Sequence, residues 1–244
     1  MPSVSGFLDA AERAIAAVVQ VAYRAWLAAV RKAVLAPYDC FRLSPDPNGV
    51  WMASPLWNGH IDRLMADLRQ IARRGWADAA LDLGEALPFD VQSQILADQL
   101  QRTRNLMVRT PDEVYRRVIQ ELGKGGSVDE QAQRVRQLLD FEGVENWESR
   151  ARTVATTETH RAYAFGGLAA AQRLQLRLGV LFKRWDSMRD AAVRNGHRRA
   201  HHQVRAVNQP FEVSGEHLMA PLDPSGSPSN VINCRCRAEY LRRR

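Results

Sequence analysis

Two cysteines near the C terminus and a histidine upstream are the residues best suited to binding a metal ion. Cys234 and Cys236 are separated by one residue, and His197 lies in the same part of the sequence. Two thiolates and one or two imidazoles would satisfy tetrahedral zinc coordination. However, residues 232–240 alternate as a strand does, and a strand would spread the two sulfurs, so two small apolar side chains facing a core are the alternative. We therefore expect no cofactor. If a metal ion is bound, zinc is the candidate, with His197, Cys234 and Cys236 as its ligands.

A second set of residues has the chemical types needed for acid–base catalysis. The spacing of Asp190, Arg194 and His197 brings a carboxylate, a cation and a base together on a short helix from Asp186 to Val193 and its C-terminal turn. The alternative is an ion pair between Asp190 and Arg194, one helical turn apart, with a histidine at the helix end. The sequence contains no glycine-rich phosphate loop and no nucleophile elbow. We therefore predict that the chain is not an enzyme, and keep a nuclease-like, nucleic-acid-processing enzyme as the alternative.

Positive charge is concentrated in the C-terminal part of the chain. Residues 151–244 contain 16 Lys and Arg against 7 Asp and Glu, whereas residues 1–150 contain 18 against 20. A basic half favours contact with phosphate groups or with an acidic surface. Only three of the 34 basic residues are Lys, a bias that a GC-rich coding sequence would also produce. The charge therefore leaves direct contact with nucleic acid open.

The N-terminal residues predict one long amphipathic helix. Apolar side chains recur at helical spacing over residues 5–35, and Pro37 ends this stretch. Prolines and glycines then predict a loop over residues 36–59. The longest uncharged run in the helix, Ala14 to Tyr23, is about half of what a bilayer crossing needs, so we expect a soluble protein made in a cytoplasm. The helix is either a core helix or an arm that docks on a partner.

Further helices fill the middle of the chain. Periodic apolar residues predict helices over residues 60–140. Within this range, Thr110-Pro111 and Ser127 carry the features of helix starts and predict breaks between separate helices. Another long helix is predicted over residues 148–178, after a second break. No internal repeat links these helices.

The pattern changes at Val180, where short alternating runs replace the helical period. Such runs predict short strands, and the prolines, serines and glycines between them predict loops. The predicted strands are 180–185, 203–207, 211–213 and 232–240, with a long loop over 218–230. The fold class is therefore mainly α, with a long helical N-terminal region over residues 1–147. A small α+β C-terminal module with long loops is predicted over residues 148–244.

An ordered set of residues runs from the last predicted long helix to the end of the chain. The set comprises Arg152, Thr153, Thr157, Glu158, Tyr163, Gly167, Trp185, Arg189, Asp190, Arg194, His197, Pro210, Phe211, Gly215, Pro221, Asp223, Pro224, Ile232, Asn233, Cys234, Arg235 and Cys236. In these residues the chain resembles the phage Mu F-like head morphogenesis family, the minor head proteins that include those of SPP1-type phages. This sequence departs from the family at His201-His202-Gln203, where a turn with glycine is common, so the turn must form without glycine.

The resemblance implies a structural protein of a tailed phage or prophage. It implies a minor capsid protein at the portal vertex of the virion that is assembled in the host cytoplasm and acts in head assembly, DNA packaging or DNA ejection. The implied partners are the portal protein, packaged double-stranded DNA and the major capsid or scaffold protein, with no membrane. It also implies a structural rather than a catalytic role for twelve positions of the set. These are Arg152, Thr153, Glu158, Trp185, Arg189, Asp190, Arg194, His197, Asn233, Cys234, Arg235 and Cys236.

Overall fold

The computed structural model describes residues 3–34, 55–90, 93–126 and 128–242 of the chain. The chain divides into two compact units. The first, which we call the helical unit, contains residues 14–65 and 102–152, and the second, the mixed unit, contains residues 1–13, 66–101 and 153–244. None of the described helices combines the length and the apolar character that a membrane crossing requires. The domain boundary predicted between residues 147 and 148 stays a prediction.

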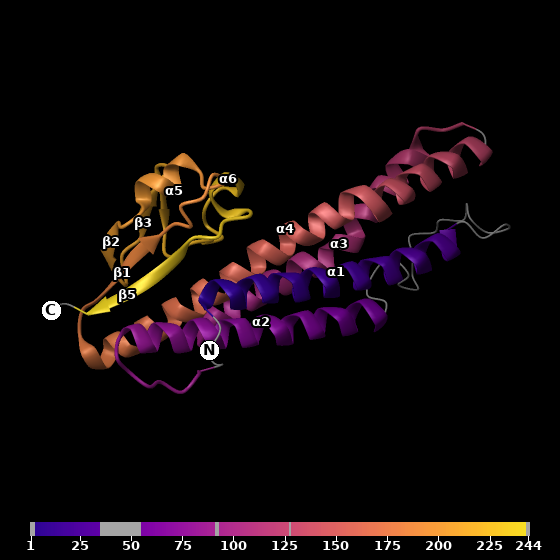
Figure 1. Ribbon diagram of the computed structural model, residues 1–244. Helices are drawn as coiled ribbons and strands as arrows, with labels where there is room; N and C mark the ends of the chain where they lie inside the picture. Colours follow the sequence, from indigo (N-terminus) through magenta and orange to yellow (C-terminus); the bar gives the residue numbers. More distant parts are fainter. Residues whose placement is uncertain (1–2, 35–54, 91–92, 127, 243–244) are drawn as a thin grey trace. The chain divides into compact units, whose positions relative to one another are not determined.

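Four long helices account for most of the chain (Figure 1). They are α1, Val4–Val34; α2, Pro55–Asp82; α3, Gln94–Gly123; and α4, Val128–Leu178. The prediction of a mainly helical chain with a long N-terminal helix is confirmed. The predicted loop over residues 36–59 is wrong at its end, because residues 55–59 already belong to α2. Its earlier part, up to residue 54, lies outside the described residues.

The helix breaks predicted inside α3 and α4 are wrong. Helix α3 continues through Thr110-Pro111, because the buried side chains of Met107, Val114 and Val118 keep one apolar stripe across the proline. Burying that stripe offsets the hydrogen bond that proline removes. Helix α4 continues through the second predicted break, where Gly143 costs only about 1 kcal/mol as a helix-interior residue. The packing of the long helices therefore outweighs the local tendency of proline and glycine to end a helix.

The core of the helical unit is built from aromatic side chains. Trp26 and Trp57 are almost fully buried, and their ring centroids are 6.0 Å apart. Tyr23 packs on Trp26 at 5.5 Å, and the indole N–H of Trp57 donates to the carbonyl of Met107 over 3.2 Å. Ile15 and other apolar residues of α1 are buried as well. The N-terminal helix is therefore a packed core helix along this part of its length.

The mixed unit contains two small antiparallel sheets. In the first, β1 (Leu181–Asp186) lies between β2 (Val204–Ala206) and β5 (Arg237–Arg242), as Figure 1 shows. Lys183 of β1 faces Arg205 on one side and Tyr240 on the other in this register. The second sheet is the hairpin of β3 (Phe211–Val213) and β4 (Glu216–Leu218). Two short helices complete the loops, namely α5 (Asn195–Ala200) and α6 (Pro228–Val231).

Three predicted elements of the C-terminal part differ from the structure. The loop predicted over residues 218–230 is wrong at both ends, because Leu218 belongs to β4 and residues 228–230 belong to α6. The helix expected up to Val193 does not form. Residues 187–189 have no regular structure, and residues 190–193 form a turn in which the carboxylate of Asp190 accepts the N–H of Ala192. Asn195-Gly196 was expected to end this helix and instead begins α5. The last strand begins only at Arg237, because Asn233 has a φ of 56°, which an extended strand does not permit.

Within the mixed unit, α2 and α4 cross at unusually short distance. A Cβ on Gly75 would lie 2.0 Å from the carbonyl oxygen of Tyr163, and one on Gly166 would lie 2.1 Å from that of Ala72. Glycine at both positions is therefore required for this helix contact. The core that covers the crossing joins both helices to the sheet, with Trp76, Leu168, Leu181 and Tyr240 among its buried residues.

Candidate functional site

The structure brings His197, Cys234 and Cys236 together. The Nδ1 atom of His197 lies 3.6 Å from the sulfur of Cys234 and 3.4 Å from that of Cys236. The possible ligand atoms of the three side chains all lie within 4.8 Å of one another. All three residues are buried, with at most 3% of their surface exposed. A histidine and two cysteines therefore meet in the interior of the mixed unit.

The backbone before β5 explains why the two sulfurs converge. Because Asn233 adopts a left-handed conformation, the chain turns before Cys234 instead of running straight. The N–H of Asn233 donates to the hydroxyl of Thr157 on α4 over 3.0 Å, and the N–H of Cys234 donates to the carbonyl of Val231. The objection that a strand would spread the sulfurs is therefore wrong for this segment, since residues 233–236 precede the strand.

Helix α5 carries the histidine into the same place. A Cβ on Gly196 would lie 1.8 Å from the hydroxyl oxygen of Ser214, so glycine lets the start of α5 approach the β3–β4 hairpin. His197 then points inward, where the ring of Trp185 meets it edge-on at 5.5 Å. The ring of Trp185 also packs against that of Phe211, with the ring centroids 5.2 Å apart. One aromatic ring, that of Trp185, therefore packs directly on the histidine of the site.

A small cavity lies beside the three side chains. Its volume is about 20 Å³. Besides His197, Cys234 and Cys236, its lining includes Arg194 and Asn233. A space of this size accommodates about one water molecule. The site therefore has room for a small ion or a solvent molecule and excludes an organic substrate.

The hydrogen bond between Cys234 and Cys236 shifts the pKa values of the two thiols in opposite directions. The hydrogen bond from Cys236 is the main cause that lowers the pKa of Cys234, and the nearby imidazole of His197 lowers it further. The same interaction, together with burial, raises the pKa of Cys236. Cys234 is therefore the more acidic of the two thiols.

The three residues considered for catalysis have different partners. Asp190 pairs with Arg235 over 2.5 Å, and Arg194 donates to the carbonyl of Ile232 over 2.5 Å, while His197 faces the two cysteines. Within the part of the chain that the structure describes, Asp190 thus pairs with Arg235 rather than with Arg194. Both contacts tie the turn after β1 to the segment that carries the cysteines.

Other residues of the ordered set connect α4 to the loops. The carboxylate of Glu158 is buried and pairs with Arg161 over 2.5 Å, and Arg161 also donates to the carbonyl of Leu222 over 3.0 Å. At the start of this helical segment, Arg152 is exposed and Thr153 is partly buried. A structural role for the set as a whole stays a prediction.

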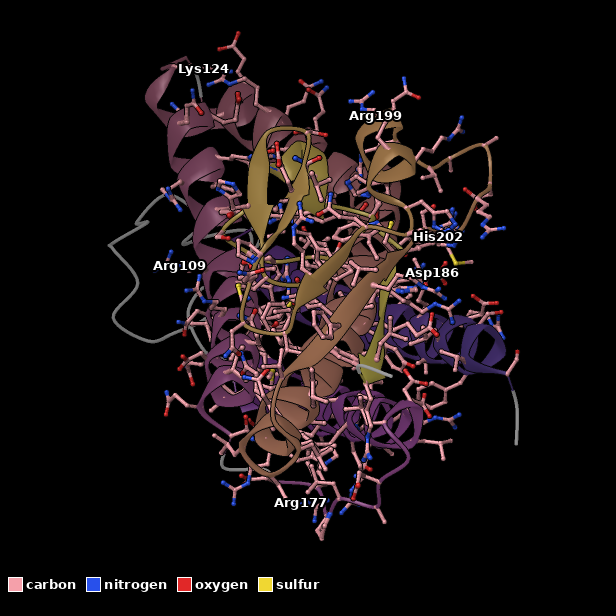
Figure 2. The ribbon with its side chains drawn as sticks, turned by 90° about the vertical axis from the view of Figure 1, so that its left-hand side faces the viewer. Arg109, Lys124, Arg177, Asp186, Arg199 and His202 are labelled. Atoms are coloured by element: carbon pink, nitrogen blue, oxygen red, sulfur yellow. The ribbon has the colours of Figure 1, made fainter. Side chains whose placement is uncertain are left out.

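The turn that lacks glycine is built by a histidine. His202 has a φ of 65°, and its N–H donates to the carbonyl of Trp185 over 2.8 Å. The side chain of Arg189 donates to the ring nitrogen of His201 over 2.9 Å and lies 3.2 Å from that of His202. His202 and Asp186 lie at the same end of the sheet in Figure 2. The turn therefore keeps a left-handed residue and stabilises it with neighbouring side chains.

Lys183 is a buried residue of the mixed unit that the sequence did not single out. Its ammonium group donates to the carbonyls of Val207 and Met219 over 3.0 and 2.6 Å, and it lies 5.0 Å from the centre of the Phe211 ring. Burial lowers the pKa of Lys183 to about 8, an effect that the charge of Asp223 partly offsets. Its position on the apolar face of β1, in line with Leu181 and Trp185, was the available signal.

Comparison with known proteins relates the chain to a protein family. The family model described as Phage Mu protein F like protein matches residues 112–239, which is more than half of the chain. No curated protein and no solved structure matches. The matched range includes every residue of the buried site and its contacts on α4.

Proposed function

Because this chain belongs to the Phage Mu protein F like family, we propose that it is a minor head protein of a tailed phage or prophage that acts at the portal vertex. Family membership makes it a phage head-related protein that associates with the virion, and it places the chain in a structural family. The finer part of the proposal is a role in head assembly, DNA packaging or DNA ejection. Its proposed partners are the portal protein, packaged double-stranded DNA and the major capsid or scaffold protein.

The observation that supports a structural role is the set of contacts made by the residues that resemble the family. Asp190, Arg194 and Asn233 each contact another segment of the same unit. Such contacts hold loops in a fixed shape, as a protein that presents a surface to larger partners requires. The same contacts argue against the nuclease-like alternative, because Asp190 and Arg194 are engaged in different pairs.

Contact with DNA is supported by the charge of the C-terminal part. Residues 151–244 contain 16 Lys and Arg against 7 Asp and Glu. Arg199, for example, is exposed on α5 and points away from the sheet (Figure 2). Arginines of this kind bind phosphate without reading base sequence. The proposal therefore expects salt-dependent binding to DNA of any sequence.

The decisive experiment is a phage in which this reading frame carries a nonsense codon. We expect heads that assemble poorly, lack DNA or fail to eject it, and rescue when the wild-type chain is supplied from a plasmid. Particles without the protein that assemble, package and eject normally would refute the proposal. An epitope on the rescuing chain should label a single vertex, the one that bears the tail. Label spread over the whole head would contradict the portal vertex.

A nuclease assay tests the alternative. The purified chain is incubated with plasmid DNA and Mg²⁺, beside the variants Asp190→Asn and His197→Ala. We expect no cleavage by any of the three proteins. Cleavage by the wild-type chain that is lost in both variants would overturn the structural assignment.

A further inference from the structure

We propose that His197, Cys234 and Cys236 bind one zinc ion that ties α5 to the segment leading into β5. The inference concerns the purified chain alone and does not depend on its place in the phage head. It rests on the distances between the three side chains, on their burial and on the cavity beside them.

The distances match those of a tetrahedral zinc site. Zinc–sulfur bonds of about 2.3 Å and a zinc–nitrogen bond of about 2.0 Å, at tetrahedral angles, separate sulfur from nitrogen by about 3.5 Å. The Nδ1 atom of His197 lies 3.6 Å from one sulfur and 3.4 Å from the other. The histidine nitrogen therefore already lies at the distance from each sulfur that a shared zinc ion requires.

Hydrogen bonding alone explains the arrangement less well. A ring nitrogen such as Nδ1 of His197 either accepts one hydrogen or donates one, yet two sulfurs lie at similar distance from it. A cation between Nδ1, Cys234 and Cys236 would interact with all three atoms at once. Two thiolates and an imidazole form a soft donor set that suits zinc rather than magnesium or calcium.

The cavity supplies the remaining coordination position. Its volume of about 20 Å³ has room for one water molecule beside the three ligands. A zinc ion with an open position is often catalytic, but here the space excludes a substrate. The ion would therefore be structural, with a water molecule as its fourth ligand.

A structural ion would stabilise a part of the mixed unit that has only a small apolar core. The core around the site consists of Trp185, Ala200, Phe211, Val213, Leu218, Leu222, Val231, Cys234 and Cys236. So few side chains, in a segment with long loops, bury little apolar surface, and small domains of this kind commonly rely on a metal or a disulfide. The proposed ion would link α5 to residues 233–236, and so hold these two segments together.

The test is the metal content of the full-length chain. The protein is purified without a histidine tag, and its metals are measured by inductively coupled plasma mass spectrometry. We expect roughly one equivalent of zinc per chain, and less than about half an equivalent would overturn the proposal. An equal amount of iron or copper instead of zinc would overturn the assignment of the metal. Cys234→Ser and Cys236→Ser should lose the zinc. His217→Gln is the matched control, because His217 is exposed on β4, and it should keep the zinc.

Cobalt substitution keeps the proposal testable if the serine variants fail to fold. Wild-type protein reconstituted with Co²⁺ should show the intense visible absorption of a tetrahedral site with sulfur ligands. His197→Cys should retain the metal and strengthen the sulfur-to-cobalt charge-transfer band, because it adds a third thiolate. An octahedral spectrum, or an intact mass lowered by the loss of both thiol hydrogens as in a disulfide, would overturn the proposal. Neither result would affect the proposed role in the phage head, which the phage experiment tests separately.

Discussion

In the helical unit, the largest buried side chains are aromatic rings on long helices, such as Trp26 against Trp57. In residues 181–242 of the mixed unit, which we call the C-terminal module, several long-range contacts instead join a polar side chain to the backbone. Lys183 donates to two carbonyls, and Arg194 donates to one. The first region thus depends on apolar area and the second on individual directed contacts.

This difference predicts how each region responds to change. Apolar burial is roughly proportional to area and does not depend on direction, so a helical core tolerates shifts along its helices. A buried polar contact has one geometry, and removing one partner leaves the other without a hydrogen bond. Substitutions in the C-terminal module should therefore act locally and depend strongly on the replacing residue.

The largest effects on stability are expected from two buried tryptophans, one in the core of each region. Trp26→Ala and Trp185→Ala should each lower the free energy of unfolding by about 3–5 kcal/mol, because both side chains are fully buried. Urea denaturation followed by circular dichroism measures the loss. Hydrogen exchange should rise in residues 14–34 for Trp26→Ala, but in residues 195–236 for Trp185→Ala. If Trp185→Ala raised exchange equally in both segments, the two regions would not be separate in stability.

The next largest effect is a pH dependence that comes from Lys183. The folded chain releases this proton near pH 8, whereas the unfolded chain holds it up to about pH 10.5. Since the unfolded state binds more protons in this window, the free energy of unfolding rises as the pH goes from 8 to 10.5, by at most about 3 kcal/mol. Lys183→Met should flatten the rise in urea titrations at several pH values.

The control for this experiment is the exposed lysine after α3. Lys124→Met should keep the wild-type pH dependence, because the side chain of Lys124 is 55% exposed. Comparing the two variants with the wild type also removes the contribution of the tyrosines that titrate at high pH. Equal slopes in Lys183→Met and Lys124→Met would show that the buried lysine does not titrate in this range.

Two glycines of α2 give the third prediction. Gly75→Ala should destabilise the mixed unit by about 2 kcal/mol, because the new methyl group would meet the carbonyl of Tyr163. Gly59→Ala, at an exposed position with no atom within 4 Å, should stabilise the helix by about 0.5–1 kcal/mol. Thermal unfolding of the two variants measures both effects, as a lower melting temperature for Gly75→Ala and a higher one for Gly59→Ala. Similar melting temperatures would mean that the close helix crossing at Gly75 does not form.

These regions also differ in how far the sequence predicts them. Periodicity located α1 and the mainly helical fold, because apolar spacing is a local property. The sequence also identified His197, Cys234 and Cys236 as candidate ligands, but it could not establish that they meet. Their approach depends on the left-handed backbone of Asn233 and on its bond to Thr157 on α4, which lies far away in the sequence. Such non-local contacts leave no periodic signal.

The smallest expected effect concerns the ion pair between Asp190 and Arg235. Its side chains are 41% and 33% exposed, so Arg235→Gln should cost less than about 1 kcal/mol, and the cost should shrink at high salt. The comparable pair of the helical unit joins Arg104 to Asp62, and Arg104→Gln should have a similar cost. A clearly larger cost for Arg235→Gln, unchanged by salt, would mean that Arg235 holds the cysteine-bearing segment in place. In that case, directed contacts would dominate the C-terminal module even at its surface, and the contrast with the helical unit would be sharper than burial alone predicts.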